Sequence, residues 1–187
     1  LGRVIHYNKR INAFEVVFFP QITADNSDIF ESAVSPIDQQ GNIWIFIKNE
    51  AFCYNVRTLE GRSIQLDTPR DSITYSAIVS RDDSTLFIGG KGGMYTGSIK
   101  GDSISIRPME ELQSRLIDAN TLYYHSPSQT LLIGSEDKGI YAYKEQTKEV
   151  IHYENILTDV RVTKIIPSNN ENEVLFSTNA ACIYRMG

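Results

Sequence analysis

Short apolar runs recur along the chain at a nearly constant distance. Aligning the runs NIWIFI, TLFIGG, TLLIGS and EVLFST on their first apolar residue gives the anchors Ile43, Leu86, Leu131 and Val174, which are 43, 45 and 43 residues apart. A period of about 40 to 45 residues is typical of a β-propeller blade or of a helical HEAT-type unit. The runs are short and rich in Ile, Leu, Val, Phe and Trp, and polar turn segments precede them, so the pattern favours strands and a propeller.

Each period contains four such stretches. A first apolar stretch, as in SAIVS or TLYYH, precedes the anchor run, and an aromatic strand and a fourth stretch, as in GIYAYK and EVIHYE, follow it. Four strands per period make a propeller blade. We therefore predict that residues 43–47, 85–90, 130–134 and 173–177 form the second strands of successive blades. The residues after the anchors should occupy equivalent places between adjacent sheets: Trp44, Phe87, Leu132 and Leu175.

The two ends of the sequence indicate partial blades. Residues 3–14, RVIHYNKRINAF, match the third and fourth strands of a later repeat, and the last residues, CIYRMG, match a third strand. Seventeen strands are therefore expected, one more than a closed ring of four blades needs. Because an open arc leaves unpaired backbone groups, proteins normally cover or close its ends. We expect an all-β chain in which residues 1–187 form one β-propeller segment, an arc of about four four-stranded blades. This arc would belong to a larger propeller of about seven blades or be completed by a second copy of the chain, with a self-closed four-bladed ring as the alternative.

Composition excludes several classes of partner. The 187 residues are 41% hydrophobic and 22% charged with a formal net charge of -5, as in an ordinary globular protein. No segment clusters Lys and Arg, which argues against a nucleic-acid or anionic-membrane partner. The longest apolar runs have the length of a strand, so no direct membrane contact is expected. Cys53 and Cys182 fit neither metal spacing nor a disulfide framework and are interpreted as packed thiols.

Tempting catalytic and metal motifs have plainer interpretations. Residues 89–93, GGKGG, lead into a strand instead of a helix, so they indicate a tight hairpin and not a phosphate loop. Asp82 and Asp83 lack the spacing of a calcium loop. The three histidines, His6, His125 and His152, lie on or beside predicted strands with no nucleophile motif near them, and we expect them to be packing residues. Residues 109–116, MEELQSRL, predict a short surface helix. No cofactor, metal or catalytic residue is expected.

One motif resembles a known family. The stretches Asp38-x-x-Gly41-Asn42-Ile43-Trp44 and Leu131-Leu132-Ile133-Gly134, followed by Gly139-Ile140-Tyr141, resemble the two-component-regulator propeller repeat, although Phe46 and Ser177 replace the usual glycine. The resemblance implies part of the periplasmic sensor region of a hybrid histidine kinase, responding to a carbohydrate and carrying no catalysis itself. A propeller enzyme of the streptogramin-lyase-like or sugar-active type stays as the alternative.

Ligands of propellers are expected on the face where the connections from fourth to first strand and from second to third strand converge. The first set comprises residues 21–30, 67–74, 109–120 and 155–161, and the second set comprises residues 48–51, 89–93, 135–138 and 178–181. Arg70, Arg115 and Arg161 lie in the first set, and a guanidinium suits a carboxylate or sulfate of an acidic sugar. These three arginines are the candidate ligand-binding residues, the alternative being ordinary surface arginines. The expected partners are an oligosaccharide or another small ligand, together with the remaining blades or a second copy.

Overall fold

The structure is a computed structural model that describes residues 4–18, 32–47, 50–68, 73–153, 160–170, 173–180 and 183–186. These residues form seventeen strands and one short helix, so the all-β prediction and the strand count are confirmed. No helix among them is long and apolar enough to cross a membrane. Arg70 and Cys182 lie outside the described residues.

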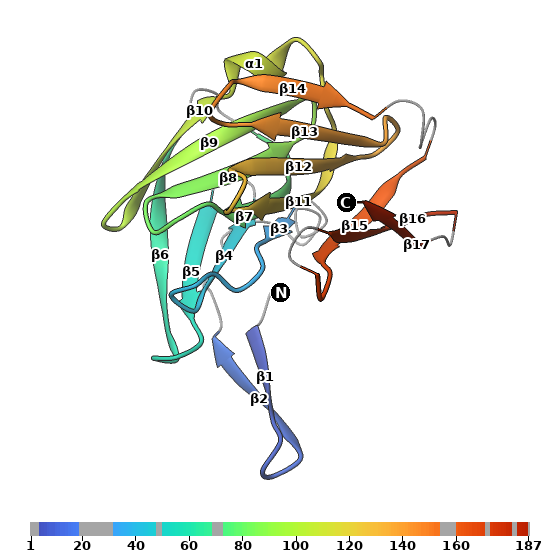
Figure 1. The fold of residues 1–187 in the computed structure, drawn as a ribbon. Helices are drawn as coiled ribbons and strands as arrows, with labels where there is room; N and C mark the ends of the chain where they lie inside the picture. The colour runs from blue at the N-terminus through green and yellow to red at the C-terminus, as the bar shows by residue number, and fades with distance from the viewer. Residues whose placement is uncertain are drawn as a thin grey trace.

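The strands follow one another as an opening hairpin, three four-stranded blades and a final three-stranded sheet (Figure 1). The hairpin contains β1 (Val4–Asn8) and β2 (Ala13–Phe18). The first blade contains β3 (Ser32–Val34), β4 (Asn42–Ile47), β5 (Glu50–Asn55) and β6 (Glu60–Asp67). The second contains β7 (Tyr75–Ser80), β8 (Thr85–Gly90), β9 (Gly93–Lys100) and β10 (Ser103–Pro108). The third contains β11 (Ala119–His125), β12 (Thr130–Ser135), β13 (Ile140–Lys144) and β14 (Glu149–His152). The final sheet contains β15 (Val162–Pro167), β16 (Val174–Thr178) and β17 (Ile183–Met186).

The predicted second strands are all present, as β4, β8, β12 and β16. Each pairs antiparallel with the strand before it and the strand after it, as a blade requires. The GGKGG stretch is the hairpin between β8 and β9, with Gly90 opposite Gly93 and Gly92 at φ +75°. The predicted helix is shorter than its sequence pattern. Only α1 (Glu110–Gln113) is helical, and the chain leaves it through Leu116 at φ +46°.

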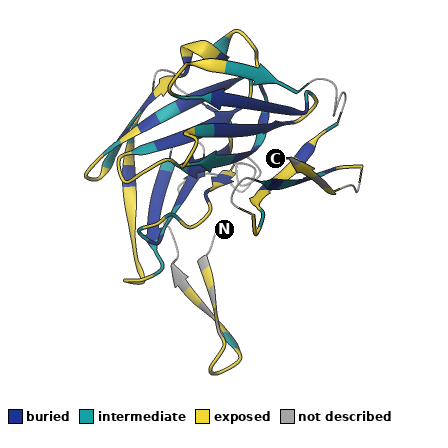
Figure 2. Ribbon diagram, viewed as in Figure 1, coloured by how far each residue is buried: buried dark blue, intermediate teal, exposed yellow. Residues whose placement is uncertain are grey.

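The core lies between adjacent sheets, where apolar side chains from facing blades interlock. Trp44, Phe87 and Leu132 are buried in three successive clusters, each shared with the following sheet. The prediction of equivalent packing is thus confirmed for these three residues. Leu175 is half-buried, on the face of the last sheet that is turned away from the third blade. Burial concentrates in the strands of the three blades and is lower in the opening hairpin and the final sheet (Figure 2).

The first two blades are joined in a way that the repeat does not predict. At their outer edge β6 and β10 pair in parallel, which merges both blades into an eight-stranded sheet. Nearer the axis Phe46 occupies the place that Gly89 has in the second blade, and its ring packs edge-on against Tyr75 with the centroids 5.1 Å apart. A phenyl ring there holds the inner parts of the two sheets further apart than a glycine would. The Phe46–Tyr75 contact and the outer pairing of β6 with β10 join the same two blades.

Both ends of the arc expose apolar side chains. On the opening hairpin Ile5 pairs with Val16 and Tyr7 with Phe14, and all four side chains are exposed. Residues paired directly across two strands share one face of the sheet, so these four form one apolar face. On the final sheet the side chain of Ile183 is 77% exposed.

Candidate functional site

The first strands of the blades surround a central cavity of about 600 Å³. Strands β3, β7, β11 and β15 are the edge strands of their sheets, so each turns one side of its backbone toward the axis instead of toward a neighbour. Two side-chain bonds tie these inner strands together: Ser76 donates to the Ala119 carbonyl, and Thr121 Oγ1 accepts from the Ile165 amide at 3.4 Å. The cavity is lined by Val34, Ser35, Pro36, Ser76, Ala77, Ile78, Val79, Asn120, Thr121, Leu122, Tyr123, Tyr124, Lys164, Ile165, Ile166 and Pro167.

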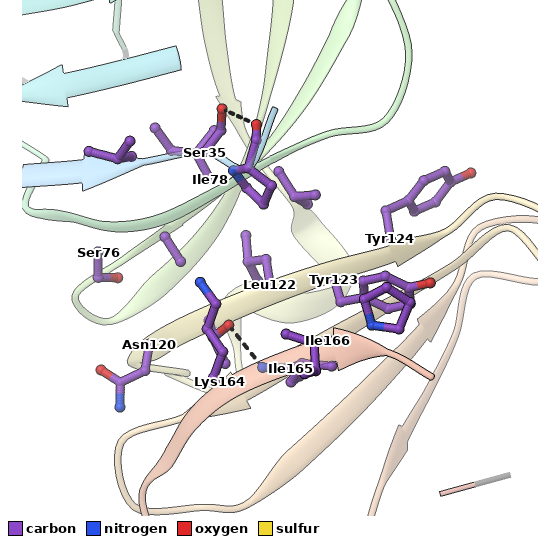
Figure 3. A pocket seen from close by; sticks show the side chains of 16 residues that line it. Ser35, Ser76, Ile78, Asn120, Leu122, Tyr123, Tyr124, Lys164, Ile165 and Ile166 are labelled. Carbon is purple, nitrogen blue, oxygen red and sulfur yellow. Dashed lines mark hydrogen bonds between the residues drawn. The ribbon is translucent and has the colours of Figure 1, made fainter. Parts of the chain in front are cut away.

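The two ends of this cavity differ in chemistry (Figure 3). Ser76, Asn120 and Lys164 lie toward one end, and Tyr123 and Tyr124 lie toward the other. Apolar side chains make up most of the wall between the two ends. A mainly apolar cavity with a few polar groups is the usual form of a small-molecule site.

A second, smaller cavity of about 200 Å³ adjoins the polar end. It shares Ser76 and Asn120 with the larger cavity, so the two are neighbours. Its lining comes from the predicted ligand-binding loops and the strand ends beside them: Thr74, Ser76, Lys91, Asp118, Ala119, Asn120 and Glu136. Hydroxyl, amide, ammonium and carboxylate groups therefore line this smaller cavity, the polar mouth.

A repeated backbone bond fixes the loops of the polar mouth. In the second blade, the third blade and the final sheet, the backbone amide of the residue directly after the second strand donates to the carbonyl of the residue directly before the first strand. Lys91 N donates to Thr74 O at 2.9 Å and Glu136 N donates to Asp118 O at 2.9 Å. Asn179 N donates to Arg161 O at 3.1 Å in the final sheet. Equivalent residues of successive blades therefore present their side chains on the same face.

Side chains of the polar mouth also connect one blade to the next. The Asp118 carboxylate accepts from the Gly92 amide of the preceding blade. Glu136 Oε2 accepts from Asn120 Nδ2 at 2.6 Å and lies 3.0 Å from Nε of Arg161, which belongs to the following sheet. Both carboxylates of the polar mouth thus already bond protein groups. A ligand bound there would compete with, or rearrange, these contacts between blades.

The candidate arginines have different positions. Arg161 forms the ion pair with Glu136 at the polar mouth. Arg115 is exposed after α1 and lines neither cavity, and its carbonyl accepts from Lys138 Nζ at 3.4 Å. Their role in binding stays a prediction. Lys91 and Lys164 also line the cavities and were not among the predicted binding residues, although Lys91 lies in the second set of predicted ligand loops.

The remaining candidates have structural contacts. His152 stacks on Tyr141 with the ring centroids 4.0 Å apart, and His125 Nδ1 is 2.7 Å from Ser128 Oγ. Asp82 Oδ1 accepts from the amide and the hydroxyl of Ser84, both at 2.8 Å, which makes it a turn residue. Burial raises the pKa of the Cys53 thiol, a free cysteine inside the core. No cluster of three metal-ligating side chains occurs in the described part of the chain.

Comparison with known proteins gives matches in fold alone. No known protein family matches the sequence, and no curated protein does. The extracellular domain of BT4673 from B. thetaiotaomicron, described as a hybrid two-component system, superposes with a TM-score of 0.65 and 18% identity over 99% of this chain. The chain is a β-propeller arc. A second structure of that domain, described as part of a one-component system, matches with a TM-score of 0.65 and 16% identity over 98% of the chain.

The propeller arc spans only 24% and 23% of the length of those two structures. It also matches the β-propeller domain of Cps50 (Swd1) from Myceliophteria thermophila, with a TM-score of 0.59 and 11% identity over 82% of this chain and 50% of that one. The resemblance to two-component propellers that the repeat motif suggested is therefore confirmed in the fold.

Proposed function

We propose that the chain is a non-catalytic, ligand-sensing segment of the periplasmic part of a two-component signalling protein, and that it binds a carbohydrate at the central cavity and its polar mouth. The observation that carries the proposal is this cavity, which the first strands of four successive sheets enclose. The fold shared with the extracellular domain of BT4673 supports the signalling context. In the whole protein a histidine kinase would receive the signal.

The geometry suggests how binding produces a signal. A ligand that touches several inner strands at once favours the arrangement of blades in which all those contacts form. The contacts between blades at the polar mouth, such as Arg161 with Glu136, would shift with that arrangement. The sensor would thus act by changing the relative positions of its blades and of the domains attached to them.

Ligand binding can be tested with a matched pair of cavity variants. Val34 lines the cavity and is exposed, whereas Ile37 is equally exposed, lies three residues later and does not line it. We expect Val34→Trp to abolish oligosaccharide binding measured by calorimetry on a panel of plant and host glycans, and Ile37→Trp to leave it intact. Binding that survives Val34→Trp would place the ligand elsewhere.

The alternative to a non-catalytic sensor is an enzyme, and an assay of turnover distinguishes the two. The same glycan panel and macrocyclic lactones are incubated with the chain and assayed for new reducing ends or ring opening. Turnover that Asp118→Asn or Glu136→Gln abolishes would favour a propeller enzyme of the streptogramin-lyase-like or sugar-active type. No turnover is expected.

The apolar face of the opening hairpin and the exposed Ile183 of the final sheet support further propeller blades or a second copy of the chain as partners. Apolar faces of this kind are normally covered in a stable assembly. Light scattering on the purified chain tests the second copy. A dimer that Phe14→Lys and Ile183→Lys dissociate would favour a second copy, and a monomer would favour further blades.

A further inference from the structure

Lys164 is the one charged side chain among the sixteen residues that line the central cavity. It is exposed, and it makes no hydrogen bond or ion pair with any residue that the structure describes. Its neighbours in the cavity wall include Leu122, Ile165 and Ile166. Because charges interact more strongly beside apolar walls than in open water, the free ammonium group attracts an anion entering the cavity.

The charges around both cavities also favour an anion. Two acidic residues, Asp118 and Glu136, line the polar mouth. Of the basic residues, Lys91 lines the polar mouth and Lys164 lines the central cavity. A third basic residue, Arg161, is paired with Glu136. The balance is one positive charge, on a chain whose net charge is -5. Asp118 and Glu136 already accept hydrogen bonds from protein groups, so the lysines are the charges left for a ligand.

The far end of the cavity suits the body of a sugar ring. Tyr124 donates its hydroxyl to Glu145 at 2.6 Å. The hydroxyl of Tyr123 has no partner among the described residues, and its half-buried ring lines the cavity. A tyrosine combines an apolar ring, which packs against C–H groups, with a hydroxyl that pairs with a polar group. The cavity thus offers a cation at one end and an amphipathic aromatic side chain at the other.

We propose that the central cavity binds a carboxylated sugar, with the carboxylate at the ammonium group of Lys164 and the ring toward Tyr123. This assignment rests on the proposed function for the sugar and adds the acidic group as the feature that is recognised. Asn120 lies at the same end as Lys164 (Figure 3), and because an amide has two N–H donors, one can bond Glu136 while the other reaches the carboxylate.

The test compares two probes that differ in one group. Methyl β-D-glucuronide carries a carboxylate where methyl β-D-glucoside carries a hydroxymethyl group. We expect the wild-type chain to bind the glucuronide about tenfold more tightly, the size of one charged hydrogen bond, and the difference to shrink as salt is raised. The ammonium resonance of Lys164 in NMR spectra should shift with the glucuronide and not with the glucoside.

Two variants distinguish a specific effect of Lys164 from a general effect of the charge of the chain. Lys164→Gln should remove the preference for the glucuronide and leave the melting temperature unchanged. Lys100→Gln removes the same charge from an exposed site outside both cavities and should preserve the preference. Equal affinity for both probes, or a preference that survives Lys164→Gln, would overturn the assignment and leave the proposed function standing. If neither these probes nor the glycan panel bind and the Lys164 resonance does not move, both proposals fail.

Discussion

The indole Nε1 of Trp44 donates a hydrogen bond to Asp38 Oδ2 at 3.2 Å. The other carboxylate oxygen of Asp38 accepts from the amides of Gln40 at 3.0 Å and Asn42 at 2.7 Å. Gly41 lies between them at φ +88°, a conformation that glycine adopts without strain. One carboxylate therefore closes the turn between β3 and β4 and anchors the indole that packs against the next blade. This network explains the Asp-x-x-Gly-Asn-x-Trp motif by stability alone.

Asp38→Ala should destabilise the chain by about 2 to 3 kcal/mol, because it removes charge-assisted hydrogen bonds and leaves partly buried donors unpaired. The measurement is urea unfolding followed by Trp44 fluorescence. Asp83→Ala is the control, since Asp83 is exposed in a turn and should change stability by less than about 0.5 kcal/mol. Equal effects of the two variants would contradict the structural role of Asp38.

Leu132 and Leu175 occupy equivalent positions in the repeat, but only Leu132 is buried under a following sheet. Leu132→Ala should cost about 2 to 5 kcal/mol through lost burial and the cavity that remains. Leu175→Ala should cost less than half as much, because water already reaches that side chain. Unfolding free energies from denaturant titration decide this. A loss at Leu132 no larger than at Leu175 would refute packing between blades as the reason for the repeated residue.

Gly89 is held by the close approach of the next blade. A Cβ atom added there would lie 2.6 Å from Cβ of Ala119 on β11. Gly89→Ala should therefore destabilise the chain by about 1 to 3 kcal/mol, the usual cost of overpacking. In the double variant Gly89→Ala with Ala119→Gly, the methyl group only changes sides, so stability should largely return. A double-mutant cycle in thermal unfolding measures this, and strictly additive losses would show that the clash is not the cause.

The blade pattern was readable from sequence because it is local. The alternation of residues around Ile43, Leu86 and Leu131 and the turn residues between them depend on neighbours in the chain. The cavity depends on how sheets tilt, which the repeat does not encode. In the sequence, Lys164 is an ordinary polar residue of the stretch TKIIP. It lines the cavity only because four inner strands meet around it. The pairing of β6 with β10 was not predicted for the same reason, since it depends on how two blades meet, as does the contact of Phe46 with Tyr75.

Asp67 and Arg107 connect β6 to β10 across the parallel pairing, with Arg107 Nη2 2.8 Å from Asp67 Oδ2. Hydrogen bonds from Arg107 and Ser105 lower the pKa of Asp67. A carboxylate whose pKa is lower in the folded state adds stability above its unfolded pKa of about 3.9, and that stability is lost as the pH falls through the folded pKa. Asp67→Asn should therefore lower the melting temperature at pH 7 and have a smaller effect below about pH 3. Asp83→Asn is the control, and an Asp67→Asn effect that persists undiminished in acid would exclude the ionic origin.

Arg161 tests whether the ion pair at the polar mouth serves stability or binding. Its side chain is half exposed, so its pair with Glu136 should contribute less than about 1 kcal/mol to folding. In binding, however, Arg161 neutralises a carboxylate beside the cavity. Arg161→Gln should therefore leave the melting temperature nearly unchanged while weakening the binding of methyl β-D-glucuronide measured by calorimetry. Adding Glu136→Gln removes the exposed carboxylate and should restore most of the affinity if charge balance is the cause. If the double variant stays as weak as the single one, Arg161 touches the ligand itself, as its place in the predicted loops suggested.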